Sequence, residues 1–203
     1  VSGGLLSLIK AMDAWISGIR SMIMACIILV LAWTIGDVCA DMKTGEYIVD
    51  LTSGILTPVL LPAVTFITAS IISFSTGSSW ATMSILVPVT VPMSIQLLGG
   101  EGNQVVQDPI FLSTFAGVLS GSVFGDHCSP ISDTTVLSST ASGSDHIDHV
   151  RTQLPYAVIS GVIALLAGYI FTGLGISLIV SLSVGLVLVI GVLKIFGKPI
   201  LHE

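Results

Sequence analysis

Long apolar runs, separated by short segments rich in proline, glycine and serine, constrain this chain more than any other feature. Residues 21–36 contain no charged side chain, and residues 153–172 and 175–196 form two further strongly apolar runs. A helix of about 20 residues is about 30 Å long, which matches the hydrocarbon core of a bilayer. The sequence therefore predicts an all-α fold that crosses a membrane several times.

The composition agrees with lipid as the main solvent. The chain is 53% hydrophobic and only 9% charged, whereas about 25% of the residues in a soluble domain are charged. Lys and Arg together number six, so no basic face for nucleic acid is expected. The three cysteines are odd in number and scattered, which does not predict a disulfide framework.

The hydrophobic pattern divides the chain into a series of expected elements. Residues 1–20 have apolar side chains at helical spacing, which predicts a surface helix or the end of an earlier span. The segments expected after it are a span at 21–39, a helical hairpin at 55–98 with a polar tip at 75–79, a discontinuous span at 110–140, a polar loop at 141–152, and two spans at 153–172 and 175–196.

Basic residues predict the orientation of these segments. Arg20, Arg151, Lys194 and Lys198 lie beside spans, and the positive-inside rule places such residues in the cytoplasm. The C-terminus is then cytoplasmic, and the hairpin at 55–98 begins and ends on the outer side. A re-entrant hairpin is favoured, because a polar tip is tolerated at membrane depth only where protein or water surrounds it.

Two carboxylates flank a proline inside the discontinuous span. Asp126 precedes Pro130 and Asp133 follows it. Proline lacks the amide hydrogen that a helix interior needs, so it enforces a break or starts the second half-helix. A carboxylate at the bilayer centre costs at least about 2.5–3.5 kcal/mol. Such a group is expected to be neutral, paired or bound to a cation.

These features predict a site for which a cation and a proton compete. Burial favours the neutral form of a carboxylate, and a bound Na⁺ favours the charged form. Hydroxyl groups and the free carbonyls of interrupted helices are suitable ligands for a hard cation. The predicted ligands are Asp126 and Asp133 for Na⁺, with hydroxyls of Thr76, Ser78, Ser79, Ser129, Ser132, Thr134 and Thr135, and the predicted helix-break residues are Gly77, Gly125 and Pro130.

The same residues can also have structural roles. Either aspartate, Ser129 or Ser132 can cap the second half-helix. Gly117, Gly121 and Gly125 recur every four residues, a spacing that lets membrane helices approach closely. The Asp and His residues at 145–149 are expected in a solvated loop, where histidine can tune a pH response.

Enzymatic and scaffold functions are the alternatives from other classes. Membrane aspartyl proteases require glycine three residues before the aspartate, and position 123 is valine. A triad of Ser129, His127 and Asp126 is not expected, because neighbours in sequence rarely converge as nucleophile, base and orienting group. A non-transporting membrane scaffold is disfavoured by the polar breaks. No enzyme activity and no cofactor are therefore expected.

The polar motifs resemble those of one transporter family. Residues 124–135, Phe-Gly-Asp-His-Cys-Ser-Pro-Ile-Ser-Asp-Thr-Thr, are similar to the signature of the NhaC family of Na⁺/H⁺ antiporters. Residues 76–82 resemble that family's Gly-Thr-Ser-Trp-Gly-Thr stretch, with Ser78 in place of threonine and Ala81 in place of glycine. Residues 31–36, Leu-Ala-Trp-Thr-Ile-Gly, also fit the family.

The resemblance implies a transporter of the cell membrane that exchanges Na⁺ and H⁺. It implies inverted repeats, an elevator motion and a homodimer, and it makes residues 1–203 a single transmembrane domain equivalent to the C-terminal repeat. An N-terminal half is then also required. Exchange of malate for lactate and transport of amino acids are the alternatives. An anionic substrate needs a nearby basic group, and residues 44–150 contain no Lys or Arg.

Overall fold

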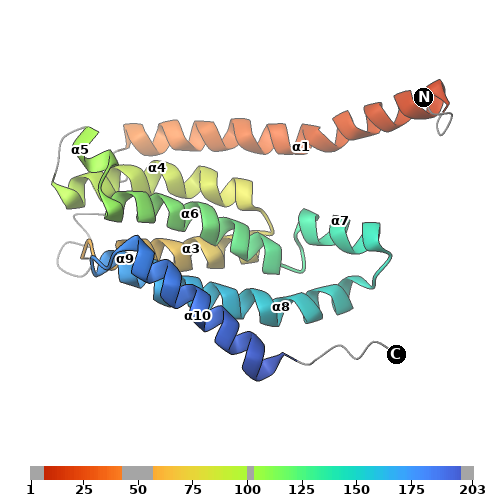
Figure 1. Ribbon diagram of the computed structural model, residues 1–203. Coiled ribbons are helices and arrows are strands. Elements are labelled where there is room, and N and C mark those ends of the chain that lie inside the picture. Colours follow the sequence, from red (N-terminus) through yellow and green to blue (C-terminus); the bar gives the residue numbers. More distant parts are fainter. Residues whose placement is uncertain (1–6, 43–56, 100–102, 198–203) are drawn as a thin grey trace.

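The computed structural model describes residues 7–42, 57–99 and 103–197, and every regular element in these ranges is a helix (Figure 1). The all-α prediction is therefore confirmed. The helices are α1 (Leu8–Asp41), α3 (Leu61–Thr76), α4 (Ser79–Leu98), α5 (Asn103–Val106), α6 (Pro109–Cys128), α7 (Asp133–Ser142), α8 (His146–Ile163), the π-helix η1 (Ala164–Ile170), α9 (Phe171–Gly173) and α10 (Leu178–Phe196). Lys198 and the side chain of Asp133 lie outside the described part.

Three of the described helices are long and apolar enough to span a membrane. They are α4, the continuous helix His146–Gly173 and α10. The last two form the C-terminal pair of spans that the sequence predicts, so the chain is a polytopic membrane protein. α3 is shorter, with 16 residues. The re-entrant path of the α3–α4 hairpin stays a prediction, since α4 by itself has the length for a complete crossing.

The contact between α3 and α6 forms the centre of the structure, and three glycines make it close. A Cβ atom added to Gly117 would lie 2.9 Å from the carbonyl oxygen of Pro62, and one added to Gly121 would lie 2.9 Å from the Cβ of Ala69. At Gly125, an added Cβ would lie 2.7 Å from the backbone nitrogen of Phe74. The predicted close approach through this four-residue spacing is thus confirmed.

Buried hydroxyls join the same two helices. Ser73 of α3 donates a hydrogen bond to the carbonyl oxygen of Ser122 at 2.5 Å. The hydroxyl of Thr65 lies 2.9 Å from Pro62 O of its own helix and makes a longer contact, 3.4 Å, with Thr114 O of α6. These α3 hydroxyls lie away from solvent, where an unpaired polar group would be costly. Ser73 and Thr65 therefore let the helices approach and also satisfy their own hydroxyls, whereas the buried hydroxyl of Thr114 on α6 has no partner among the described residues.

Two predicted boundaries are wrong. The boundary predicted between residues 20 and 21 does not exist, because α1 runs without interruption from Leu8 to Asp41 and lies beside α4 (Figure 1). The predicted loop at 141–152 is also much shorter. Asp145 caps α8 by accepting hydrogen bonds from the amides of Ile147 and Asp148 at 2.9 and 3.1 Å. A helix N-terminus needs such an acceptor, so the polar residues here start a helix.

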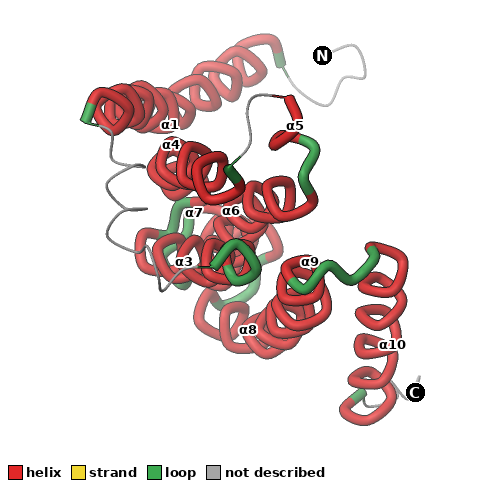
Figure 2. The backbone as a smooth tube through the Cα atoms, turned by 90° about the vertical axis from the view of Figure 1, so that its left-hand side faces the viewer, coloured by secondary structure: helices red, strands yellow, loops and turns green. Residues whose placement is uncertain are grey.

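The C-terminal helices lie on the opposite side of the α3–α6 pair from α1 (Figure 2). The π-helical segment η1 carries Tyr169, whose ring stacks on that of Phe66 with centroids 4.9 Å apart. Its hydroxyl is hydrogen-bonded to Ser120 of α6. Tyr169 of the π-helical segment thus attaches the C-terminal helices to both α3 and α6. Short π-helical segments often lie at such specialised positions.

Replacing Gly121 with valine should destabilise the protein by roughly 1–3 kcal/mol, because the added atoms overlap α3 in a closely packed contact. Gly191→Val is the matched control, since a Cβ at Gly191 of α10 has no atom within 4 Å. Thermal unfolding of the detergent-solubilised protein measures the difference. Equal midpoints for both variants would contradict the proposed importance of the contact.

Candidate ion-binding site

Two interruptions of the helical chain face each other at one end of the α3–α6 pair. The first is the turn at residues 77–78 between α3 and α4, and the second is residues 129–132 between α6 and α7. Gly77 ends α3 with a φ of 68°, and a Cβ there would lie 2.9 Å from the carbonyl oxygen of Ile131. Glycine is needed for both the left-handed backbone and the close approach.

Ser129 joins the two interruptions directly. Its side chain is fully buried, and its hydroxyl donates to the carbonyl oxygen of Phe74 at 2.8 Å. Phe74 lies in the last turn of α3, where carbonyl groups have no partner within the helix. The hydrogen bond therefore satisfies a helix end and keeps the hairpin tip against the break in the other chain segment.

Asp126 lies in the last turn of α6, beside both interruptions. Its residue surface is only 8% exposed. Ser79 donates to its Oδ2 atom at 3.0 Å, and Ser132 donates to its Oδ1 atom at 2.5 Å. One hydroxyl comes from the hairpin tip and the other from the break. The carboxylate therefore depends on both segments for the hydrogen bonds that replace water.

Ser132 has a second role at the start of α7. Its hydroxyl oxygen accepts a hydrogen bond from the amide of Thr134 at 3.2 Å, which is the contact of an N-cap residue. α4 begins at Ser79 and α7 begins immediately after Ser132. Two helix N-termini thus meet at Asp126, and their partial positive charges favour a negative charge there.

The carbonyl groups of the break are satisfied by side chains of the protein. His127 O accepts from Nε2 of Gln153 at 2.6 Å and from the hydroxyl of Thr135 at 3.4 Å. Pro130 O lies 2.7 Å from Nε2 of His146. Each of these carbonyls therefore has at least one donor within the protein. That carbonyls of the break also bind a cation, as the sequence predicts, stays a prediction.

His146 and Gln153 are residues that the sequence reasoning missed. Both belong to α8, which begins where a solvated loop was expected. Their spacing of seven residues places them on one face of a helix. That signal becomes visible only once the helix start at Asp145 is recognised from its capping pattern.

The structure distributes the predicted site residues among different partners. Ser79 and Ser132 reach Asp126, whereas the hydroxyl of Thr76 bonds Ile72 O of its own helix at 2.9 Å. Ser78 caps α4 by accepting from the amide of Ala81 at 3.3 Å. Thr134 is exposed and pairs with the hydroxyl of Ser132 at 2.8 Å.

Gly125 does not break the helix as predicted. α6 continues to Cys128, and Gly125 is buried inside it against α3. The chain leaves the helix only at Ser129, immediately before Pro130, because a residue that precedes proline is disfavoured in helical conformation. Asp133 begins α7.

The groups around Asp126 are of the oxygen type that suits a hard cation rather than a transition metal. Among the described residues, no three His, Cys, Asp or Glu side chains gather in one place. The polar atoms in contact with Asp126 are hydroxyl oxygens, which are ligands that alkali and alkaline-earth cations prefer.

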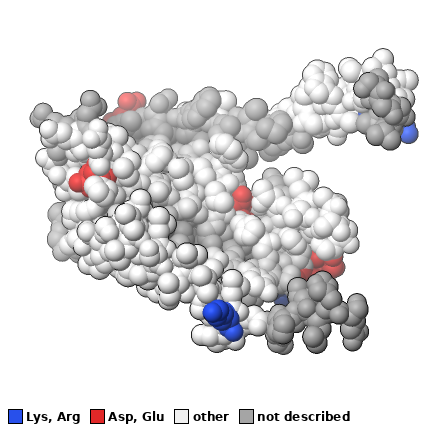
Figure 3. Space-filling model, in the orientation of Figure 1, with Lys and Arg blue, Asp and Glu red and all other residues white. Residues whose placement is uncertain are grey.

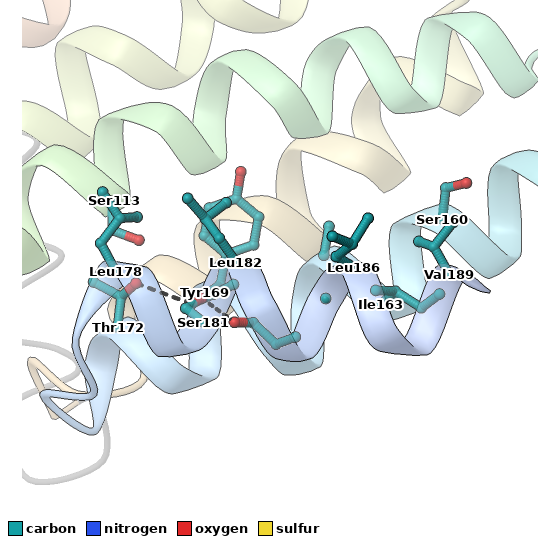
Figure 4. Close-up of a pocket in the computed structure, with 14 residues that line it drawn as sticks. Ser113, Ser160, Ile163, Tyr169, Thr172, Leu178, Ser181, Leu182, Leu186 and Val189 are labelled. Carbon is teal, nitrogen blue, oxygen red and sulfur yellow. Dashed lines mark hydrogen bonds between the residues drawn. The ribbon is translucent and has the colours of Figure 1, made fainter. Parts of the chain in front are cut away.

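A separate cavity lies between the π-helical segment and α10. Its volume is 510 Å³, and apolar side chains such as Ile163, Leu182 and Val189 form most of its wall (Figure 4). No carboxylate lines it, so this cavity does not offer the chemistry found at Asp126.

The white surface in Figure 3 shows how few charged groups the drawn face carries.

Comparison with known proteins assigns the family. Residues 1–174 match the model of the Na⁺/H⁺ antiporter family. The chain belongs to this family. The resemblance seen in the polar motifs is therefore confirmed over most of the chain.

Three relatives illustrate the range within the family. An uncharacterized protein of Haemophilus influenzae is 40% identical over 89% of this chain and 34% of its own length. The malate-2H⁺/Na⁺-lactate antiporter of Bacillus subtilis is 36% identical over 60% of this chain and 25% of its own length. The Na⁺/H⁺ antiporter NhaC of Alkalihalophilus pseudofirmus is 29% identical over 77% of this chain and 32% of its own length.

The chain thus spans about a third or less of the length of these relatives. No solved structure matches it significantly. The structural description of the site therefore rests on the contacts of Asp126 in this chain.

Replacing Ser129 with alanine should destabilise the protein by roughly 1–3 kcal/mol, because the carbonyl of Phe74 loses its donor in a buried contact. Ser75→Ala is the control, since Ser75 is exposed and bonds only a carbonyl of its own helix. Thermal unfolding in detergent gives the comparison. An unchanged midpoint for Ser129→Ala would show that this hydrogen bond does not stabilise the paired interruptions.

Proposed function

We propose that the protein containing this chain exchanges Na⁺ for H⁺ across the cell membrane, and that Asp126 binds the two ions alternately. One observation carries the proposal. Asp126 is a buried carboxylate between two helix interruptions, and hydroxyls from both interruptions donate to it. Membership of the Na⁺/H⁺ antiporter family supports the same ions.

The physical basis is that an isolated charge is unfavourable at this depth. A buried carboxylate must be neutralised either by a proton or by a bound cation. When Asp126 is ionised, the two donated hydroxyl hydrogens orient it and Na⁺ balances its charge. The oxygen of Ser79 can add a neutral ligand. When a proton binds instead, Na⁺ loses its anionic ligand and leaves. One site therefore admits one ion at a time.

Asp133 is proposed as a second acidic group of the same site. It begins α7, directly after Ser132, so its backbone position follows the residue that binds Asp126. A second carboxylate would increase the affinity for a cation. Other predicted ligands contact the backbone around the site: Thr76, Ser78, Ser129 and Thr135. The hydroxyl of Thr134 instead pairs with that of Ser132.

The wider arrangement is part of the same proposal. Residues 1–203 form a single transmembrane domain equivalent to a C-terminal repeat, with the C-terminus in the cytoplasm. An N-terminal half, an elevator motion and a homodimer complete the transporter. The proposal of an N-terminal half is supported by the length of the relatives, since this domain spans only 34% of the Haemophilus influenzae protein.

Asp126→Asn should abolish Na⁺-dependent proton flux, because asparagine neither binds a proton nor carries a charge for Na⁺. The measurement uses proteoliposomes that contain the protein expressed from its complete coding sequence. Asp148→Asn is the control, since Asp148 is an exposed carboxylate at the start of α8. Wild-type flux in Asp126→Asn would rule out the proposed role of this carboxylate.

Ser79→Ala should raise the Na⁺ concentration for half-maximal flux by about tenfold, which corresponds to about 1.4 kcal/mol, the loss of one hydrogen bond to a charged group. Maximal flux at saturating Na⁺ should change much less. Ser75→Ala, an exposed position on the same hairpin, should behave as wild type. Identical half-saturation in Ser79→Ala would exclude Ser79 from the site.

Exchange of organic acids is the second candidate function. The similarity to the malate-2H⁺/Na⁺-lactate antiporter supports it, and the two helix N-termini at Asp126 can bind an anion. Against it, residues 44–150 contain no Lys or Arg. If organic acids are substrates, L-malate and L-lactate should be required for Na⁺-dependent proton flux. We expect flux in their absence.

A further inference from the structure

Two side chains of α8 hold the interrupted segment that follows α6. Nε2 of Gln153 donates to the carbonyl of His127, the penultimate residue of α6. His146, two turns earlier on the same face, contacts the carbonyl of Pro130 within the break. The first two turns of α8 therefore attach to both sides of Ser129, which lies between these carbonyls.

The ring of His146 makes a contact through each nitrogen. Nε2 lies 2.7 Å from Pro130 O, and because a carbonyl oxygen only accepts, Nε2 carries the hydrogen. Nδ1 lies 3.1 Å from the hydroxyl of Ser139, which is 1% exposed. Ser139 belongs to α7. His146 thus connects α8 both to the break and to the helix after it.

These two contacts enclose the residue that binds Asp126. Pro130 lies two residues before Ser132, and Ser139 lies seven residues after it on α7. Ser132 itself donates to Oδ1 of Asp126 and caps α7. A shift of the break relative to α8 would therefore move the hydroxyl of Ser132 relative to the carboxylate.

We propose that His146 is a positioning residue that sets the Na⁺ affinity of Asp126 by holding the break and α7 in register with α8, with Gln153 in the same role. This inference rests on the proposed function. His146 does not touch the ion. Residues that orient ion ligands typically change metal affinity by about 10–100-fold when they are replaced.

Two substitutions separate the positioning contact from the bulk of the ring. In His146→Gln, the side-chain amide nitrogen occupies about the place of Nε2 and can donate to Pro130 O. In His146→Asn, the amide reaches only about the place of Nδ1, so the contact with Pro130 is lost. His149→Gln is the control, one turn further along α8 and not part of either contact. Gln153→Met removes the second contact independently.

The experiment measures Na⁺-dependent proton flux against Na⁺ concentration for the protein expressed from its complete coding sequence and reconstituted in liposomes. His146→Asn and Gln153→Met should each raise the half-saturating Na⁺ concentration by about tenfold or more. Maximal flux should stay within about threefold of wild type, while His146→Gln and His149→Gln should retain wild-type half-saturation within the same factor. Thermal unfolding midpoints confirm that each variant is folded.

The outcomes separate this inference from the function on which it rests. Lost flux in Asp126→Asn together with unchanged half-saturation in both His146→Asn and Gln153→Met would overturn the positioning role alone. Equal impairment of His146→Gln and His146→Asn would overturn the role of the Nε2 contact. Wild-type flux in Asp126→Asn would overturn the proposed function and this inference with it.

Discussion

The close contact between α3 and α6 is the constraint on which the rest of the structure depends. Glycines at every fourth residue of α6 bring its backbone against that of α3. Both helices end at the same level, so the turn after α3 meets the break after α6. Ser129 can then donate to Phe74, and Ser79 can reach Asp126. Larger side chains along this stripe would separate the two interruptions.

The second constraint is that interrupted helices leave backbone groups that the membrane cannot hydrate. Here side chains from other elements satisfy them. Ser129 donates a hydrogen bond to a carbonyl of α3, and Gln153 donates one to a carbonyl of α6. His146 donates to the carbonyl of Pro130. Each of these carbonyls therefore has a hydrogen-bond donor within the protein, and the break does not depend on water at that point.

Local patterns in the sequence predicted a substantial part of this site. The Ser-Thr-Gly-Ser-Ser turn, the proline after Ser129 and the small residues of α6 each act over a few residues, so the sequence predicts their effects. Gly125 was misassigned because a glycine beside a proline break fits both a helix end and a helix contact. Packing against Ser70 and Phe74 resolves this in favour of the contact.

The amino-acid pattern alone identifies this chain as a membrane protein with two polar interruptions and a carboxylate inside the membrane at one of them. Hydrophobic length, proline geometry and glycine spacing are local properties, so they can be recognised without coordinates. The packing of the helices establishes which hydroxyls reach Asp126 and brings His146 and Gln153 to the carbonyls of the break. These contacts join residues up to 47 positions apart, and their partners depend on where each helix starts and how the helices pack.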